Sequence, residues 1–184
     1  MALLNNYKGD YIMDGLRVIP VSNMDLIYSV TAVADDIWHE HFTPIIGEEQ
    51  VDYMLDKFLS PDALAEQINS GYQYYLFSFE YTFAGFAGVH KEAGKDGEPG
   101  SLFLSKLYVE KDFRGKGIAS YMFHQFIELC KKNDLSKIWL TCNRHNTNTL
   151  EVYKHWGFET VREEVTDIGN GFVMDDYILE YKIS

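Results

Sequence analysis

The stretch KDFRGKGIAS, residues 111–120, places two glycines among one arginine and two lysines, directly before an apolar helical pattern. Glycine lets the backbone turn tightly and approach a ligand closely. The first turn of a helix presents unpaired N–H groups and the positive end of the helix dipole. Together these properties predict an anion-binding turn.

The segments on either side of this turn predict a strand and a helix. Residues 102–109, LFLSKLYV, are a mostly apolar run that leads into the turn and predicts a strand. Residues 117–131 follow it with apolar side chains at helical spacing. The stripe that should face the core is Ile118, Met122, Phe126, Leu129 and Cys130.

The rest of the chain continues this mixture of elements. Further helices are expected at 25–43, closed by Thr43-Pro44, at 48–59, at 62–68 after Ser60-Pro61, and at 148–156, ended by Gly157. Further strands are expected at 16–21, 72–79, 83–90, 137–141, 160–166 and 172–181. The order of elements predicts a mixed α/β domain. We expect a single domain over residues 1–184 with its core at 16–182.

Composition narrows the class of protein. The chain has 184 residues, 46% of them hydrophobic, and a net charge of −12. Such an acidic chain lacks the basic face that nucleic-acid binding requires. No stretch approaches the roughly 20 apolar residues of a membrane span, and no signal-peptide pattern opens the sequence. Cys130 and Cys142 are expected to be buried, reduced thiols, which indicates a cytoplasmic protein.

Charge is distributed unevenly along the chain. Residues 106–154 hold nine Lys/Arg and five Asp/Glu, a balance of +4, whereas the remainder holds seven and 23, a balance of −16. The basic part suits an anion, and the acidic part suits either a cation or plain solubility.

Two common phosphate-binding motifs do not fit the basic turn. The four-residue spacing and Gly-Lys-Ser/Thr of a P-loop are absent. The dinucleotide fingerprint also fails, because Ser120 stands where its third glycine belongs. The pattern R/Q-x-x-G-x-G/A is met by Arg114, Gly117 and Ala119, and NTNTLEVYKHWGF follows at 146–158.

These two motifs, in this order, resemble those of the GCN5-related N-acetyltransferase (GNAT) superfamily. Segments 37–58 and 165–177 are similar to bacterial diamine and spermidine acetyltransferases. The resemblance implies a mixed, mostly antiparallel sheet of about six or seven strands flanked by helices, with splayed strands forming the acetyl-CoA cleft. It also implies transfer of an acetyl group from acetyl-CoA to an amine, without a metal, and is compatible with a homodimer.

The resemblance further implies which residues bind acetyl-CoA. Backbone N–H groups of 114–119, with the charges of Arg114 and Lys116, would hold the pyrophosphate. Main chain at 107–109 would bind the pantetheine arm, and an N–H near Val109 would stabilise the oxyanion. The implied cofactor-binding residues are Leu107, Tyr108, Val109, Arg114, Gly115, Lys116, Gly117, Ile118, Ala119, Asn143 and Asn146.

Tyr153 matches the family tyrosine that lies near the thioester sulfur. A phenol with an ordinary pKa of about 10 stays protonated and can donate its proton to the departing CoA thiolate. We therefore expect Tyr153 to be the general acid. The alternative is that Tyr153 is a core aromatic beside Leu150 and Trp156.

The general base is left open by the sequence. Many relatives carry a glutamate on the strand before the loop, but SLFLSKLYV at 101–109 has no carboxylate. A water chain is one alternative. A metal site in WHEH is rejected, because its two histidines are two positions apart and point in different directions on a helix. The candidate bases are His39, Glu40, His41, Glu80, His90, Asp175 and Asp176.

The sequence also leaves the identity of the acetyl acceptor open. A small cationic amine or polyamine is the first choice, a protein amino group is the alternative among enzymes, and a non-catalytic acyl-CoA-binding module is the alternative outside them. The aromatic run at 71–83 could pack in the core or line the acceptor pocket.

Overall fold

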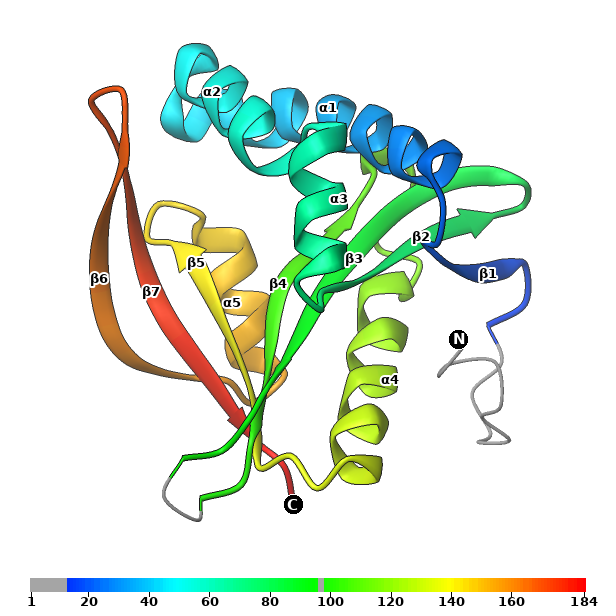
Figure 1. Ribbon diagram of the computed structural model, residues 1–184, viewed down its shortest axis with the longest axis vertical. Helices are drawn as coiled ribbons and strands as arrows, with labels where there is room; N and C mark the ends of the chain where they lie inside the picture. Colours follow the sequence, from blue (N-terminus) through cyan, green and yellow to red (C-terminus); the bar gives the residue numbers. More distant parts are fainter. Residues whose placement is uncertain (1–12, 96–97) are drawn as a thin grey trace. The chain divides into compact units, whose positions relative to one another are not determined.

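The computed structural model describes residues 13–95 and 98–184 (Figure 1). Its strands follow the order β1-β2-β3-β4-β5-β7-β6 in one hydrogen-bonded sheet. Of the five strand pairs whose register is described, β4–β5 is parallel, and β1–β2, β2–β3, β5–β7 and β6–β7 are antiparallel. The chain divides into two compact units, one up to His90 with Lys106–Phe126, the other Lys91–Ser105 with Ile127–Ser184. The mixed, mostly antiparallel fold is thereby confirmed, whereas the single domain stays a prediction.

The first unit contains the early helices and the first hairpin. Its elements are β1 (Leu16–Pro20), α1 (Met24–Ile46), α2 (Glu48–Leu59), α3 (Pro61–Asn69), β2 (Gln73–Phe79), most of β3 (Thr82–Glu92), the end of β4 (Ser101–Val109) and the start of α4 (Ile118–Lys132). Asn23 and Ser60 cap α1 and α3 through their side chains. Glu80 and Tyr81, with φ of 48° and 69°, make the tight β2–β3 turn.

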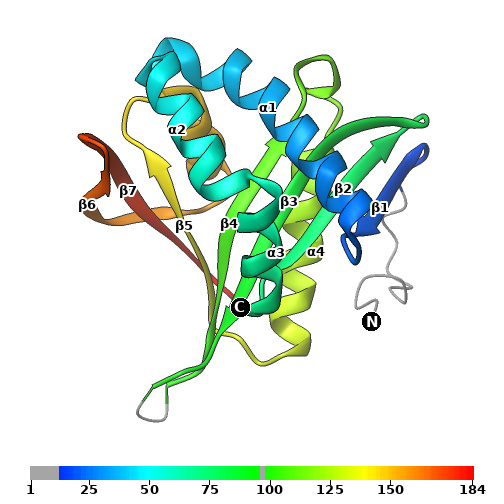
Figure 2. The same cartoon turned by 45° about the horizontal axis from the view of Figure 1, so that its top comes forward.

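Helices cover both faces of β2. The Tyr74 hydroxyl donates to Gln67 of α3 at 2.7 Å, and the Tyr75 ring lies 6.2 Å from the ring of Phe126 on α4. Because consecutive strand residues point to opposite faces, α3 and α4 lie on opposite sides of this strand. Figure 2 shows α1 and α2 on the same side of β2 as α3.

The first helix is longer than its sequence predicted. We expected Thr43-Pro44 to close it, but α1 continues through Pro44 to Ile46. Proline removes the N–H that would bond the Glu40 carbonyl. This loss falls in the last turn, where the Gly47 N–H donates to the Thr43 carbonyl at 3.0 Å and Gly47 takes a φ of 85°. One lost bond so close to the end does not stop the helix.

The second unit contains the motif helix and the closing hairpin. Its elements are the start of β4, β5 (Lys137–Asn143), α5 (Thr147–His155), β6 (Glu159–Gly169) and β7 (Phe172–Lys182). The parallel ladder of β4 with β5 covers only Ser101–Phe103 and Lys137–Trp139. The antiparallel ladder of β5 with β7 covers all of β5. Asn170 and Gly171, at positive φ, turn β6 into β7.

The predicted apolar stripe of α4 forms part of the core. All five of its residues are buried, and both cysteines are buried and free, as expected. No described helix has the length and apolar composition that a membrane crossing requires.

Candidate active site

The basic turn is built around two glycines in left-handed conformation. After β4 a short 3₁₀ helix, Lys111–Phe113, which the sequence did not predict, leads into the turn. Gly115 and Gly117 have φ of 75° and 84°, values that residues with a Cβ rarely adopt. The first bond of α4 runs from the Tyr121 N–H to the Gly117 carbonyl at 2.9 Å. The N–H groups of the residues between them therefore have no acceptor within the helix, as an anion site requires.

Lys116 is held in place by two aromatic rings. Its Nζ lies 5.4 Å from the ring centroid of Phe79 and 5.1 Å from that of Phe113. Cation–π contacts of this kind restrain an ammonium group without neutralising it. The positive charge of Lys116 thus remains available beside the turn. Phe79 lies too far away in sequence for this contact to be predicted.

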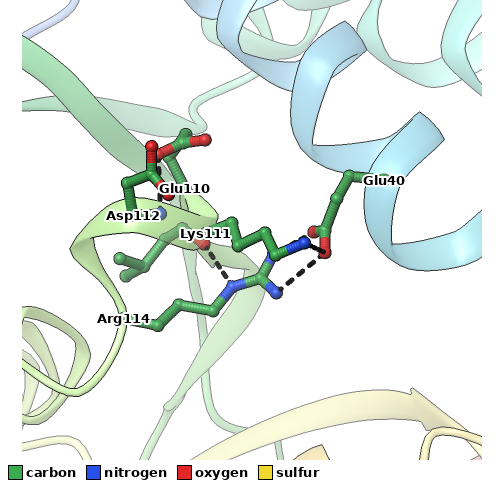
Figure 3. Close-up of polar contacts among 6 residues, drawn as sticks. Glu40, Glu110, Lys111, Asp112 and Arg114 are labelled. Atoms are coloured by element: carbon green, nitrogen blue, oxygen red, sulfur yellow. Dashed lines mark hydrogen bonds and ion pairs between the residues drawn. The ribbon is translucent and has the colours of Figure 1, made fainter.

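Arg114 contacts an acidic residue of α1. Its Nη2 lies 2.5 Å from Oε2 of Glu40, and its Nη1 lies 3.4 Å from Oε1. Its Nε donates to the Val109 carbonyl at 3.0 Å. Figure 3 shows the guanidinium lying between the end of β4 and the side chain that α1 extends toward it. Hydrogen bonds from Arg114 hold the pKa of Glu40 below its usual value, which makes this candidate a weaker base.

The end of β4 is fixed by β3 and by aromatic packing. A Cβ on Gly85 would lie 2.2 Å from the Tyr108 carbonyl oxygen, so the two backbones are in close contact there. The Glu110 N–H donates to the Ala84 carbonyl at 2.9 Å. The Tyr108 ring packs against Trp38, Phe42 and Phe86. Leu107, Tyr108 and Val109 are half-buried on this restrained strand.

The second motif places its residues at the end of β5 and on α5. Asn143 accepts the His145 N–H on its side-chain oxygen at 2.9 Å. Asn146 precedes α5, is buried, and does not cap the helix through its side chain. Tyr153 is buried on α5, with its ring 5.7 Å from Trp156 and 5.3 Å from Phe158. Burial raises the pKa of the Tyr153 phenol, which keeps it protonated. The ring packing agrees with both interpretations of this residue.

Asp176 is a buried carboxyl on β7. It is 8% exposed and stands opposite Asn143 in the β5–β7 ladder. Burial raises the pKa of Asp176 to about 6, and a hydrogen bond with Thr141 opposes the rise. The neighbouring Asp175 is instead ion-paired, with its Oδ1 3.1 Å from Nε of Arg144. Unlike Asp175, Asp176 is therefore a candidate base that can change its charge near neutral pH.

Asp176 and Cys142 lie on opposite faces of the β5–β7 ladder. Residues directly opposite in a ladder share a face, and alternate residues share a face, so Asp176 lies with Asn143 and Thr141. Cys142 points the other way and is near enough to Tyr153 to add to the rise of its pKa. The Asp176 carboxyl thus lies on one face of β5, and the Tyr153 phenol is close to a residue of the other face.

The remaining candidate bases lie in local contacts or turns that do not involve Asp176 or Tyr153. His39 lies with its Nε2 2.9 Å from Oδ1 of Asp52, a contact that raises the pKa of His39. The His90 ring stacks on Tyr72 with centroids 4.7 Å apart. His41 packs edge-on against Phe42, and Glu80 occupies the β2–β3 turn. Within residues 13–95 and 98–184, no three His, Cys, Asp or Glu side chains gather as metal ligands.

Lys106 is a titratable residue that the sequence motifs did not single out. It lies on β4, and burial lowers the pKa of its ammonium to about 8. A lysine in a run of apolar residues was the available signal, since a buried lysine loses part of its preference for the charged form.

Comparison with known proteins identifies the family. Residues 42–179, three quarters of the chain, match the family model described as acetyltransferase (GNAT) domain. The chain belongs to the GNAT acetyltransferase family. It is therefore an acetyl-CoA-dependent N-acetyltransferase, as the motifs implied.

Individual relatives of this GNAT enzyme are distant. An uncharacterised N-acetyltransferase in the pepI 3′ region of Lactobacillus delbrueckii subsp. lactis is 24% identical over 161 residues, 86% of this chain and 92% of that protein. The spermine/spermidine N(1)-acetyltransferase of Bacillus subtilis (strain 168) is 25% identical over 84 residues, 44% of this chain and 55% of that protein. The PaiA N-acetyltransferase from Thermoplasma acidophilum, solved with coenzyme A, has 20% identity and a TM-score of 0.73 over 91% of this chain and 98% of that one. At this identity the structural likeness shows the fold.

Proposed function

We propose that this GNAT enzyme acetylates a small cationic amine, with spermidine or a related polyamine as the first choice. The observation that carries the proposal is the charge division, +4 over residues 106–154 and −16 over the remainder. A surface of one sign concentrates ligands of the opposite sign. CoA is an anion and suits the basic part, whereas a polycation suits the acidic part. The partial match to a spermine/spermidine acetyltransferase agrees with this choice.

The described contacts support a specific role for each part of the basic turn. In the proposed complex, N–H groups of the turn and the first turn of α4 bind the CoA pyrophosphate, assisted by the restrained Lys116 charge. The β4–β5 ladder ends at Phe103, and Leu107–Val109 lie beyond it. Their main-chain groups bind the pantetheine arm, and the N–H of Val109 stabilises the oxyanion. Asn143 and Asn146 contact the cofactor arm from the second motif.

The proposed chemistry is direct transfer with one proton donor and one proton acceptor. The Asp176 carboxylate takes a proton from the ammonium, directly or through water, because only the neutral nitrogen has a lone pair. That nitrogen attacks the thioester carbon, and the C–S bond of the tetrahedral intermediate then breaks. Tyr153 gives its proton to the CoA thiolate, and the second proton of the nitrogen passes to solvent, from which the phenol is reprotonated. A phenol kept protonated by burial and a carboxyl with a pKa near 6 fit these opposite tasks.

The role of Asp176 predicts a change in the pH profile. Only the ionised carboxylate accepts a proton, so kcat/KM of the parent enzyme should fall as pH drops through about 6. Asp176→Asn should lower kcat/KM by about 100-fold at pH 8 and remove this acidic limb. Asp175→Asn, next to it, should keep the limb. A limb that survives in Asp176→Asn would assign the proton to another group.

The proposal as a whole is tested by thiol release from acetyl-CoA with a panel of amines. Spermidine and other di- or polyamines should release thiol, with N-acetylated product confirmed by mass. Uncharged-tailed amines of similar length should react more slowly at equal concentration. If no polyamine is acetylated, the acceptor is a different amine.

The proposed setting of the enzyme follows from the cofactor and the cysteines. Both cysteines are buried and free, as is common in reducing compartments. We expect the enzyme to act in the cytoplasm. A homodimer stays a prediction.

A further inference from the structure

The first residue of the motif is engaged within the protein. We expected the Arg114 charge to face the pyrophosphate. Instead, both terminal nitrogens of its guanidinium contact the Glu40 carboxylate, and its Nε donates to the Val109 carbonyl. All three nitrogens therefore have protein acceptors. A paired guanidinium attracts an anion less than a free one does, because the carboxylate beside it cancels most of its field.

We infer that Glu40 is a positioning residue for the acetyl-CoA site, fixing Arg114 so that the end of β4 and the glycine turn keep the shape that binds the cofactor. The inference rests on the proposed placement of acetyl-CoA in this turn. Glu40 acts through Arg114 and does not touch the cofactor. The anion contacts are then made by the backbone N–H groups and by Lys116.

The contacts of Arg114 with Glu40 and Val109 join three pieces of backbone, and two of these pieces form the proposed acetyl-CoA site. Glu40 belongs to α1, Arg114 to the turn, and Val109 to the end of β4. A planar guanidinium that bonds two carboxylate oxygens and a carbonyl has one orientation, which a lysine could not reproduce. Lys111, with its Nζ 3.8 Å from Glu40 Oε1, adds a second and looser contact.

Simple electrostatics predicts the opposite effect for Glu40. A carboxylate near an anion site repels the anion, so its removal alone should tighten acetyl-CoA binding. Removal of a positioning contact should weaken binding, because the turn must then be ordered when the cofactor binds. The two explanations therefore differ in sign. The pair is only about two-thirds buried, with side-chain exposures of 37% for Arg114 and 35% for Glu40, so it contributes little to overall stability.

The experiment compares three variants by calorimetric titration with acetyl-CoA at pH 7.5. Glu40→Gln removes the charge, and Glu40→Asp keeps the charge but shortens the reach. Asp36→Asn is the matched control, since Asp36 is exposed on α1 one turn before Glu40. Glu40→Gln should weaken binding by about 5- to 10-fold and Glu40→Asp by a smaller factor. Asp36→Asn should bind as tightly as the parent or slightly tighter.

Steady-state kinetics adds a second readout. The KM for acetyl-CoA should rise in Glu40→Gln, whereas kcat at saturating acetyl-CoA should stay within about twofold of the parent. Equal or tighter binding by Glu40→Gln, as in Asp36→Asn, would overturn the inference. A fall in kcat without a change in affinity would also overturn it. Failure of the cofactor placement itself is recognised separately, by a Gly117→Val variant that binds acetyl-CoA normally.

Discussion

Tyr153→Phe should lower kcat by about 100-fold or more, with acetyl-CoA affinity unchanged. The substitution keeps the ring, which packs against Trp156 and Phe158, and removes only the hydroxyl. Without its proton the CoA thiolate must leave unassisted. The measurements are single-turnover acetyl transfer, which isolates the chemical step, and calorimetric titration with acetyl-CoA.

Tyr28→Phe is the control for loss of a hydroxyl, because Tyr28 is 56% exposed on α1. It should have no effect on either quantity. If single-turnover rates of Tyr153→Phe match the parent, Tyr153 is a core aromatic and the proton comes from elsewhere. A loss of affinity with an unchanged rate would assign it to cofactor binding alone.

Gly117→Val should weaken acetyl-CoA binding by several kcal/mol, a factor of about 100 or more. Gly117 has a φ of 84°, so valine both strains the turn and places a branched Cβ where the pyrophosphate must approach. Within the protein the nearest atom to a Cβ there is the flexible end of Met13, at 3.2 Å. The expected loss therefore comes from the cofactor and the distorted turn, and calorimetric titration measures it.

Backbone strain alone is controlled by Gly171→Val. Gly171 has a φ of 81° in the β6–β7 turn and open space around its Cβ position. This variant should lose stability in thermal unfolding as Gly117→Val does, yet bind acetyl-CoA normally. Equal affinities for Gly117→Val and the parent would place the cofactor elsewhere.

Local patterns predicted most of the fold. Ser60-Pro61 predicted the start of α3, and the apolar stripe predicted the buried face of α4. Each of these signals depends on residues close in sequence. Pro44 misled the prediction, because a proline in the last turn of a helix removes only one bond and Gly47 still closes the helix.

The sequence predicted the motif residues of the candidate site, but it did not predict which residues those motif residues contact. The turn glycines were readable from spacing, since only glycine suits both positive φ values. The partner of Arg114 was not, because Glu40 lies 74 positions away. The same reason hides Phe79 beside Lys116. The sequence offered Asp176 as one of seven candidate bases. Its burial and its position opposite Asn143, which distinguish it from Asp175, are visible only in the structure.

The central claim, charge-based selection of a cationic acceptor by this acetyltransferase, is tested most directly by the salt dependence of kcat/KM. Between about 10 and about 150 mM salt the Debye length falls from about 30 to about 8 Å. With acetyl-CoA saturating, kcat/KM for spermidine should fall steeply over this range, whereas an uncharged-tailed amine of similar length should show little change. Parallel salt curves for the two amines would contradict the account.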